Sequence, residues 1–237
     1  MAARIVKAYD ERRNELLDAA RRLFLRHGYD ETTVSAVIEE VGVSKGAFYH
    51  YFDSKEHLLD ALVERLTDES LGLVRPIVEA DGLDAIEKLN RFFGRIRCWK
   101  AEQMPLMLTI IRAMYRDENL VLRHKMFERN VERAGPLLGR VIRQGVDEGL
   151  MDTGHPDLAG EMILRVASAF SDMLAGLLLT IGEHPERLPQ LERRIDLYQD
   201  AIRRLLGAPE GAIRVVDDDF LAALREAASP AQGGADG

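Results

Sequence analysis

The chain has 237 residues, of which 46% are hydrophobic and 30% charged, a composition typical of a globular protein long enough for two domains. Its formal net charge of -8 argues against binding nucleic acid through overall charge, because Lys and Arg must neutralise the phosphates. A nucleic-acid site must therefore concentrate its cations locally. Cys98, the single cysteine, excludes an intramolecular disulfide, and we expect a packed thiol in a reducing cytoplasm.

The helical spacing of Leu, Ala, Arg and Glu, together with sparse proline, predicts an all-α chain. The longest apolar stretch, residues 173–181, is too short to cross a membrane, so we expect a cytoplasmic protein with no membrane contact. His27, His124, His155 and His184 are dispersed and lack the spacing of metal ligands. We therefore expect no metal and no cofactor.

The N-terminal part shows helix start and stop signals at short intervals. Gly28 and Gly42 are each placed to end a helix, because glycine readily adopts the left-handed conformation past a helix C-terminus. Thr33 and Ser44 are suitable N-caps for the helices that follow, and Pro76 is expected to end the last one. These signals predict helices over residues 12–27, 33–41, 45–51 and 55–73.

The remaining chain has longer apolar periodicities. They predict helices over residues 83–100, 105–116, 119–150, 157–181 and 185–206, and a short amphipathic helix over 217–227. Gly135 and Pro136 are expected to kink or break the third of these helices. We divide the chain into an N-terminal helical domain (residues 1–60), a larger helical domain (61–208), and a short helix with a flexible tail (209–237).

Residues 33–52 have the pattern of a helix-turn-helix, in which two short helices pack across a tight turn. The packing positions are apolar, and Gly42 provides the positive φ that the turn needs. The apolar residues are Val37, Val41, Val43 and Phe48. The second helix then presents Lys45, Gly46, Ala47, Tyr49 and His50 to solvent or to a partner. Small residues at its start would allow it to enter the major groove of DNA.

These motifs resemble the TetR family of bacterial regulators. The resemblance rests on Phe24, Gly28-Tyr29, Thr32-Thr33, Val41-Gly42-Val43-Ser44-Lys45-Gly46, Phe48-Tyr49-His50-Tyr51-Phe52, Ser54-Lys55-Glu56 and Leu58. It covers residues 12–62 closely and the rest of the chain only in architecture. One position departs from the helix-turn-helix pattern, because Ile38 stands where a small residue usually lies at the closest approach of the two helices.

The resemblance implies two kinds of contact with operator DNA. Phosphate contacts are implied for Thr33, Tyr49 and Lys55, and groove contacts for Lys45, Gly46, Ala47 and His50, with Ser44 at the start of the same helix. The chemistry agrees with the phosphate contacts, because Lys55 combines a charge with the amide donors of a helix N-terminus. Alternatively, Thr33 and Ser44 serve only as caps, and the whole run Phe48-Tyr49-His50-Tyr51-Phe52 belongs to the core, where we expect Phe48 and Phe52 in either case.

A DNA-reading module of this size makes few contacts alone, so we expect a homodimer that binds two half-sites. We predict the interface in residues 157–206, because these helices carry more apolar residues than one buried stripe requires. The alternative is a helix fully buried inside one subunit. The residues concerned are Leu158, Met162, Leu164, Val166, Phe170, Leu174, Leu177, Leu178, Leu191, Ile195, Leu197, Tyr198, Ile202 and Leu205.

Large and adaptable side chains in the middle of the chain suggest an apolar cavity for an unknown small-molecule effector, which the resemblance also implies. The alternative is that most of them are ordinary core. Arg112, Arg116 or His124 would instead suit an acidic ligand. The candidate ligand residues are Phe92, Phe93, Trp99, Met104, Met107, Met114, Tyr115, Phe127 and Phe170.

The resemblance thus implies a transcriptional repressor without enzymatic activity, which binds a palindromic operator as a homodimer and is released by a ligand. Residues 1–60 would then form the DNA-binding domain and residues 61–208 the helical ligand-binding and dimerisation domain. The helix that begins at Lys55 would join the two. A helical enzyme or lipid-binding protein with an incidental helix-turn-helix is the competing class, but we find no paired carboxylates, nucleophile motif or phosphate loop. A ligand-independent or an activating regulator also remains open.

Overall fold

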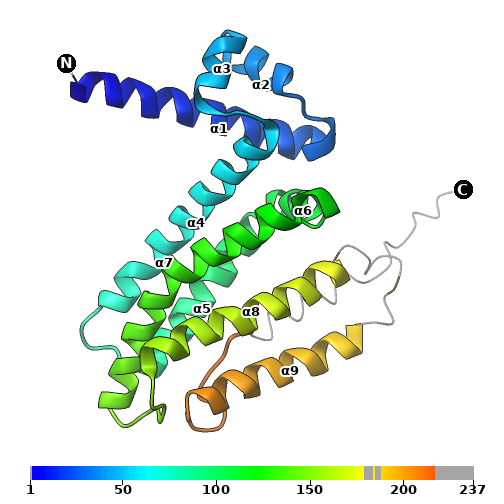
Figure 1. Cartoon of the computed structure of the whole chain (residues 1–237). Helices are drawn as coiled ribbons and strands as arrows, with labels where there is room; N and C mark the ends of the chain where they lie inside the picture. The colour runs from blue at the N-terminus through cyan, green and yellow to red at the C-terminus, as the bar shows by residue number, and fades with distance from the viewer. Residues whose placement is uncertain (1, 179–183, 185–187, 217–237) are drawn as a thin grey trace, which may run out of the picture. The chain divides into compact units, whose positions relative to one another are not determined.

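The computed structural model describes residues 2–178, 184 and 188–216, and this part of the chain is helical without strands (Figure 1). The predicted all-α class is therefore confirmed. The helices are α1 (Ala2–Glu31), α2 (Val34–Val41), α3 (Lys45–Tyr51), α4 (Lys55–Glu79), α5 (Ala85–Glu102), α6 (Met104–Met114), the short 3-10 helix η1 (Asp117–Asn119), α7 (Leu120–Asp147), α8 (Pro156–Leu178) and α9 (Leu188–Leu205).

The first helix is longer than its sequence pattern predicts. α1 begins at Ala2 instead of Arg12, so its first two to three turns precede the apolar stripe that indicated a helix. At the other end Gly28 has a φ of 82°, which interrupts the helical path as its position predicts, and one further turn reaches Glu31. The stripe itself is buried from Leu16 onward. The described side chains before Leu16, from Tyr9 to Glu15, are exposed or half-buried and so do not belong to the buried stripe.

Helix α4 passes through Pro76 and ends at Glu79, so the predicted end near this proline is wrong. A proline inside a helix removes one hydrogen bond and normally kinks or ends it. Here Val74 and Val78, two residues to either side, are both buried in the core. Burial of these side chains offsets the lost hydrogen bond, since each contributes about 1.5–3 kcal/mol relative to exposure.

Helix α7 is likewise continuous through Gly135 and Pro136, so the proline does not break it. Gly160 of α8 shows how closely α8 packs on this stretch of α7. A Cβ atom built on Gly160 would lie 2.7 Å from the backbone nitrogen of Gly139 and 2.8 Å from the carbonyl oxygen of Gly135. Glycines of the two helices therefore face each other where the backbones come closest. A larger residue at Gly160 would not fit between the helices at this separation.

The chain forms two compact units. The first contains residues 1–70 and 100–126, and the second contains residues 71–99 and 127–237. In the first unit α6 packs against α1, and α2 packs against both α1 and α3. The chain passes from one unit to the other three times, and each passage lies inside a helix, namely α4, α5 and α7.

The second unit has one apolar core, to which α4, α5, α7, α8 and α9 all contribute. α8 and α9 run side by side (Figure 1). After α9 the chain crosses this unit as a short strap that buries Ile213. Asn90 of α5 holds the strap through two hydrogen bonds, one to the carbonyl oxygen of Ala212 at 2.8 Å and one from the backbone nitrogen of Arg214 at 2.7 Å.

Three further expectations concern Cys98, the C-terminal helix and the membrane. Cys98 is exposed, so the prediction of a packed thiol is wrong; it lies on the outer side of α5, next to the buried Trp99. The predicted helix over residues 217–227 lies outside the described residues. Among the described helices, none is both long enough and apolar enough to span a membrane.

The close approach of α7 and α8 gives a stability prediction. Gly160→Ala places a methyl group against backbone atoms that cannot move aside, and we expect the free energy of unfolding to fall by about 2 kcal/mol. Gly72→Ala is the control, because Gly72 is an exposed α4 residue where an added methyl group would meet nothing within 4 Å. We expect it to be neutral or slightly stabilising. Thermal denaturation at equal protein concentration checks both; equal loss in the two variants would contradict the close approach.

Candidate nucleic-acid interface

The helix-turn-helix forms through the caps that the sequence predicts. The hydroxyl of Thr33 accepts a hydrogen bond from the backbone N–H of Ala36 at 3.1 Å, and the hydroxyl of Ser44 accepts one from Ala47 at 3.1 Å. Between the two helices Gly42 has a φ of 71°. Each cap satisfies a backbone donor that a helix N-terminus would otherwise leave free, so both short helices are fixed at their starts.

One side of this motif is buried. Val37 of α2, Phe48 of α3 and Phe52 after it are all 1% exposed or less, and the rings of Phe48 and Phe52 lie 5.8 Å apart. Val41 and Val43 are half-buried. The predicted packing positions are thus occupied as expected, and burial of the two phenylalanines sets the rotation of α3 about its own axis.

The opposite side of α3 is exposed to solvent. Lys45, Gly46, Tyr49 and His50 are exposed, and Ala47 is half-buried. The Lys45 ammonium lies 5.9 Å from the centre of the Tyr49 ring, within the range of a cation–π contact. The structure therefore exposes the predicted groove residues together on α3, where a cation at the first position is followed by two small residues and then by a phenol and an imidazole.

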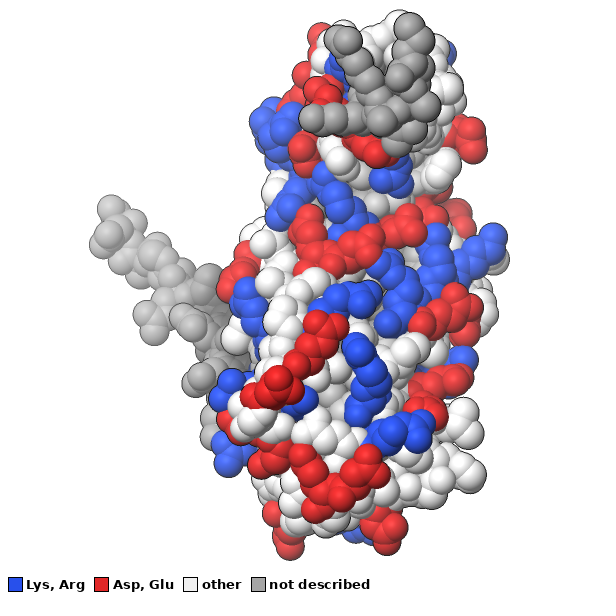
Figure 2. Space-filling view, turned by 90° about the vertical axis from the view of Figure 1, so that its left-hand side faces the viewer, with Lys and Arg blue, Asp and Glu red and all other residues white. Residues whose placement is uncertain are grey.

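Two arginines of α1 are paired with a carboxylate of α2. Glu40 of α2 lies 2.8 Å from Arg22 and 3.8 Å from Arg26, both on α1. The hydrogen bond from Arg22 lowers the pKa of Glu40 below its ordinary value. Basic and acidic side chains also alternate over the face that Figure 2 presents. These ion pairs attach α2 to α1, and they engage the Arg22 and Arg26 side chains with a carboxylate of the same unit.

Lys55 does not present a free ammonium group. Its Nζ donates to the carbonyl oxygens of Tyr29 at 3.0 Å and Asp30 at 3.3 Å, and it lies 4.3 Å from the centre of the Tyr29 ring. These carbonyls belong to the C-terminal end of α1, where a cation is favoured by the helix dipole. Lys55 thus joins the start of α4 to the end of α1, while Ser54 caps α4 by accepting from the backbone N–H of His57 at 3.1 Å.

Tyr29 completes this joint between α1 and α4. Its hydroxyl donates to Glu56 at 3.3 Å, and its ring packs 5.3 Å from that of Phe24. Burial raises the pKa of Tyr29 above its ordinary value, so the phenol remains protonated and remains a donor. A hydrogen-bonded ion pair from Arg116 to Asp30 attaches the loop after α6 to the same end of α1.

Tyr9 is a neighbour of the interface that sequence reasoning missed. Its ring lies 5.7 Å from the His50 ring and 4.6 Å from the Tyr51 ring. Arg13, one turn further along α1, lies over the Phe52 ring at 5.6 Å. No local pattern signals these contacts, because Tyr9 precedes the predicted start of the first helix and lies about forty positions before its partners.

The predicted ligand residues fall into both units. Met104, Met107, Met114 and Tyr115 belong to the first, and Phe92, Phe93, Trp99, Phe127 and Phe170 belong to the second. Phe92 is a member of the main core, against which Phe93 and Phe170 pack.

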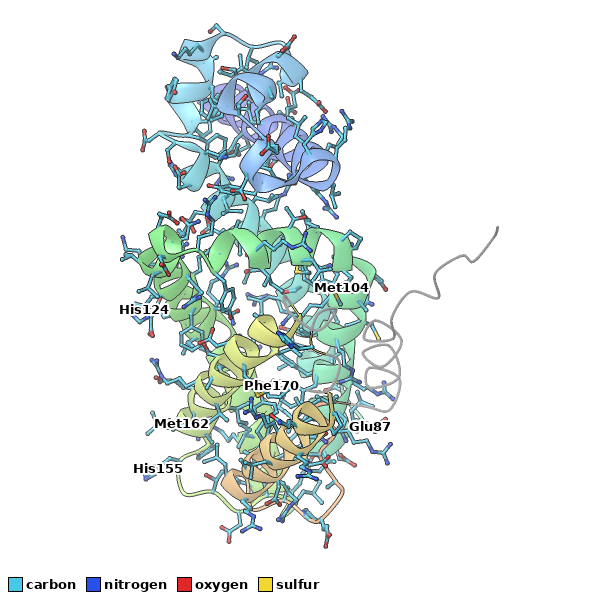
Figure 3. The ribbon with its side chains drawn as sticks, turned by 90° about the vertical axis from the view of Figure 1, so that its right-hand side faces the viewer. Glu87, Met104, His124, His155, Met162 and Phe170 are labelled. Atoms are coloured by element: carbon cyan, nitrogen blue, oxygen red, sulfur yellow. The ribbon has the colours of Figure 1, made fainter. Side chains whose placement is uncertain are left out.

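Phe170, labelled on α8 in Figure 3, stacks on Tyr198 of α9 with the ring centres 4.6 Å apart. Trp99 and Met114 are buried, and the remaining candidates are half-buried. These are contacts of a packed core. Among the described residues no three His, Cys, Asp or Glu side chains gather as a metal site would require.

The comparisons with known proteins agree with this geometry. The family described as "Bacterial regulatory proteins, tetR family" matches residues 16–62, which contain α2, α3 and the start of α4. The chain is 42% identical over 197 residues to the HTH-type transcriptional repressor AcnR of Corynebacterium diphtheriae, covering 81% of this chain and 92% of that one. It is 30% identical to the HTH-type transcriptional repressor Rv1474c of Mycobacterium tuberculosis, covering 81% of this chain and 94% of that one.

Two solved structures share the fold. A TetR-family regulator of Pectobacterium atrosepticum superposes with a TM-score of 0.61 at 20% identity, over 85% of this chain and 97% of that one. The SmeT–triclosan complex superposes with a TM-score of 0.59 at 23% identity, over 86% and 97%. With its capped helix-turn-helix and relatives that match along most of their length, the chain belongs to the TetR family, whose members are transcriptional regulators and not enzymes.

Proposed function

We propose that this protein is a repressor that binds a two-fold symmetric operator as a homodimer in the cytoplasm and leaves the operator when a small molecule binds. The observation that carries the proposal is the two-sided nature of α3: Phe48 is fully buried, and Lys45, Tyr49 and His50 are exposed on one face. A short helix anchored in this way is the element that reads the major groove in helix-turn-helix proteins. Repression is favoured over activation because AcnR and Rv1474c are named repressors.

The proposed contacts with DNA separate into two kinds. The hydroxyls of Thr33 and Tyr49 and the first amides of α4 at Lys55 contact phosphates. Because Thr33 uses its oxygen as an acceptor in the cap, its hydroxyl proton is still available for a phosphate oxygen. Within the groove, base edges are met by Lys45 and His50. Gly46, Ala47 and Ser44, the other predicted contacts, permit the close approach of the backbone.

The homodimer is proposed through residues 157–206. Leu158 and Met162 lie one turn apart on α8 and are 58% and 46% exposed, and Leu197 of α9 is 69% exposed. Figure 3 labels Met162 on α8. Large apolar side chains repeated on one helix face are typical of a surface that a partner covers. Leu177, Leu178 and Leu191 belong to the same prediction, but their side chains lie outside the described residues.

A small-molecule effector is supported by the SmeT structure, which holds triclosan, and by the adaptable side chains named above. An effector can weaken DNA binding only through a higher affinity for the conformation that does not fit the operator. The three helices that pass between the two units, α4, α5 and α7, provide continuous backbone for this coupling.

The DNA-binding proposal predicts that two variants of α3 lose affinity for DNA in different ways. Lys45→Ala removes a base contact, and we expect operator affinity to fall at least tenfold while affinity for an unrelated duplex changes little. Tyr49→Phe removes a phosphate contact, and we expect both affinities to fall together. Selection of bound sequences from random DNA supplies the operator, and titration of labelled duplexes gives the affinities. Lys125→Ala, an exposed lysine of α7, is the control; normal binding by the first two variants would contradict the assignment of α3.

A substitution of Lys55 separates the role of its side-chain ammonium from the role of its backbone amide. Lys55→Met removes the hydrogen bonds to the carbonyls of Tyr29 and Asp30, and we expect the free energy of unfolding to fall by about 1 kcal/mol. The dependence of operator affinity on salt should stay unchanged, because the ammonium does not neutralise a phosphate. A slope reduced by about one in a plot of log affinity against log salt would show that it does.

The dimer proposal predicts the effect of a charge on α8. Met162→Glu places a carboxylate in the proposed interface, where it loses its hydration, and we expect sedimentation to show monomers at micromolar concentration. Val121→Glu is the matched control, because Val121 is 64% exposed on α7 and lies outside residues 157–206. We expect this variant to remain dimeric. A dimer of unchanged strength in Met162→Glu would place the interface elsewhere.

A further inference from the structure

The first turns of α1 are unexplained by the core of their unit. The helix begins at Ala2, yet the side chains from Tyr9 to Glu15 are exposed or half-buried, and the buried stripe starts only at Leu16. An isolated helical extension of this length gains little stability in water by itself. Within residues 9–15, Tyr9 lies nearest the start of the helix, and its ring reaches the distant helix α3.

Tyr9, His50 and Tyr51 form a cluster of three rings. The Tyr9 and His50 rings lie 5.7 Å apart with an angle of 83° between their planes, an edge-to-face contact. The Tyr9 and Tyr51 rings lie 4.6 Å apart, and the His50 and Tyr51 rings lie 5.2 Å apart at 79°. Each ring thus touches both others, at separations where aromatic pairs attract one another.

The cluster bears on DNA recognition through His50. This residue lies in the last turn of α3, where its side chain is exposed, and its imidazole makes ring contacts with Tyr9 and Tyr51. An exposed imidazole without such contacts samples several rotamers, and ordering it on DNA costs free energy. Tyr51 follows His50 directly and moves with it, whereas Tyr9 comes from another helix and can hold the ring in place.

We propose that Tyr9 is a positioning residue for base recognition: by packing against His50, it holds the imidazole of the reading helix in one orientation before DNA binds. This inference rests on the proposed function, since it assigns Tyr9 a role only if α3 reads an operator. It extends the candidate interface to a third element, the N-terminal end of α1, which acts without contacting a base.

The experiment is a double-mutant cycle with the full chain. Affinities for the selected operator and for an unrelated duplex are measured at one salt concentration for the wild type, Tyr9→Ala, Tyr9→Phe, His50→Ala and the Tyr9→Ala/His50→Ala double variant. We expect Tyr9→Ala to lower operator affinity about threefold to tenfold, as the loss of one aromatic contact implies, and to leave affinity for the unrelated duplex unchanged. Tyr9→Phe, which keeps the ring, should bind as the wild type does.

The cycle distinguishes positioning from a general structural role. If Tyr9 acts through His50, the double variant binds no worse than His50→Ala, because the orientation of an absent imidazole no longer matters. Additive losses, or equal losses on both duplexes, would overturn the proposal. Asn14→Ala, an exposed α1 residue, is the control and should bind normally.

A measurement on the free protein keeps the inference testable without DNA. The ring of Tyr9 shifts the proton resonances of the His50 imidazole, so Tyr9→Ala should move them and Tyr9→Phe should not. Unmoved resonances in Tyr9→Ala would overturn the inference while leaving the proposed function intact. If the wild type selects no sequence and binds all duplexes alike, the proposed function fails and the inference fails with it.

Discussion

Burial of Phe48 is the constraint on which the geometry of the helix-turn-helix depends. α3 has seven residues, too few for a stable helix in isolation, so it exists because Ser44 caps its start and because Phe48 and the following Phe52 enter the core of the first unit. This burial also sets which residues remain outside. Lys45, Tyr49 and His50 are exposed as a consequence of where the phenylalanines go.

Contacts at helix ends connect this motif to the rest of its unit. The ammonium of Lys55 binds the carbonyls at the end of α1, and Tyr29 reaches back to Glu56, so the joint between α1 and α4 is closed from both sides. α6 packs on α1 in the same unit, although about seventy residues separate the two in sequence. Helix α1 thus contacts both α6 and α2, so it connects α6 with the helix-turn-helix inside this unit.

Close packing of α8 against α7 is the main feature of the second unit. Gly160 of α8 approaches the backbone of α7 so closely that the two helices cannot slide past one another without steric cost. The aromatic candidates Phe92 and Phe170 lie in or against this core. These side chains thus contribute to the packing of the second unit.

The sequence by itself determined the short-range features: the caps at Thr33 and Ser44, the left-handed turn at Gly42, the buried position of Phe48 and hence the family. Each depends on interactions within a few residues, which periodicity and residue type report directly. Only the tertiary structure decided that α4 continues through Pro76, that Cys98 is exposed, that the Lys55 ammonium binds α1, and that Tyr9 reaches His50. These outcomes depend on partners distant in sequence, and a local pattern carries no information about which distant residue covers a given side chain.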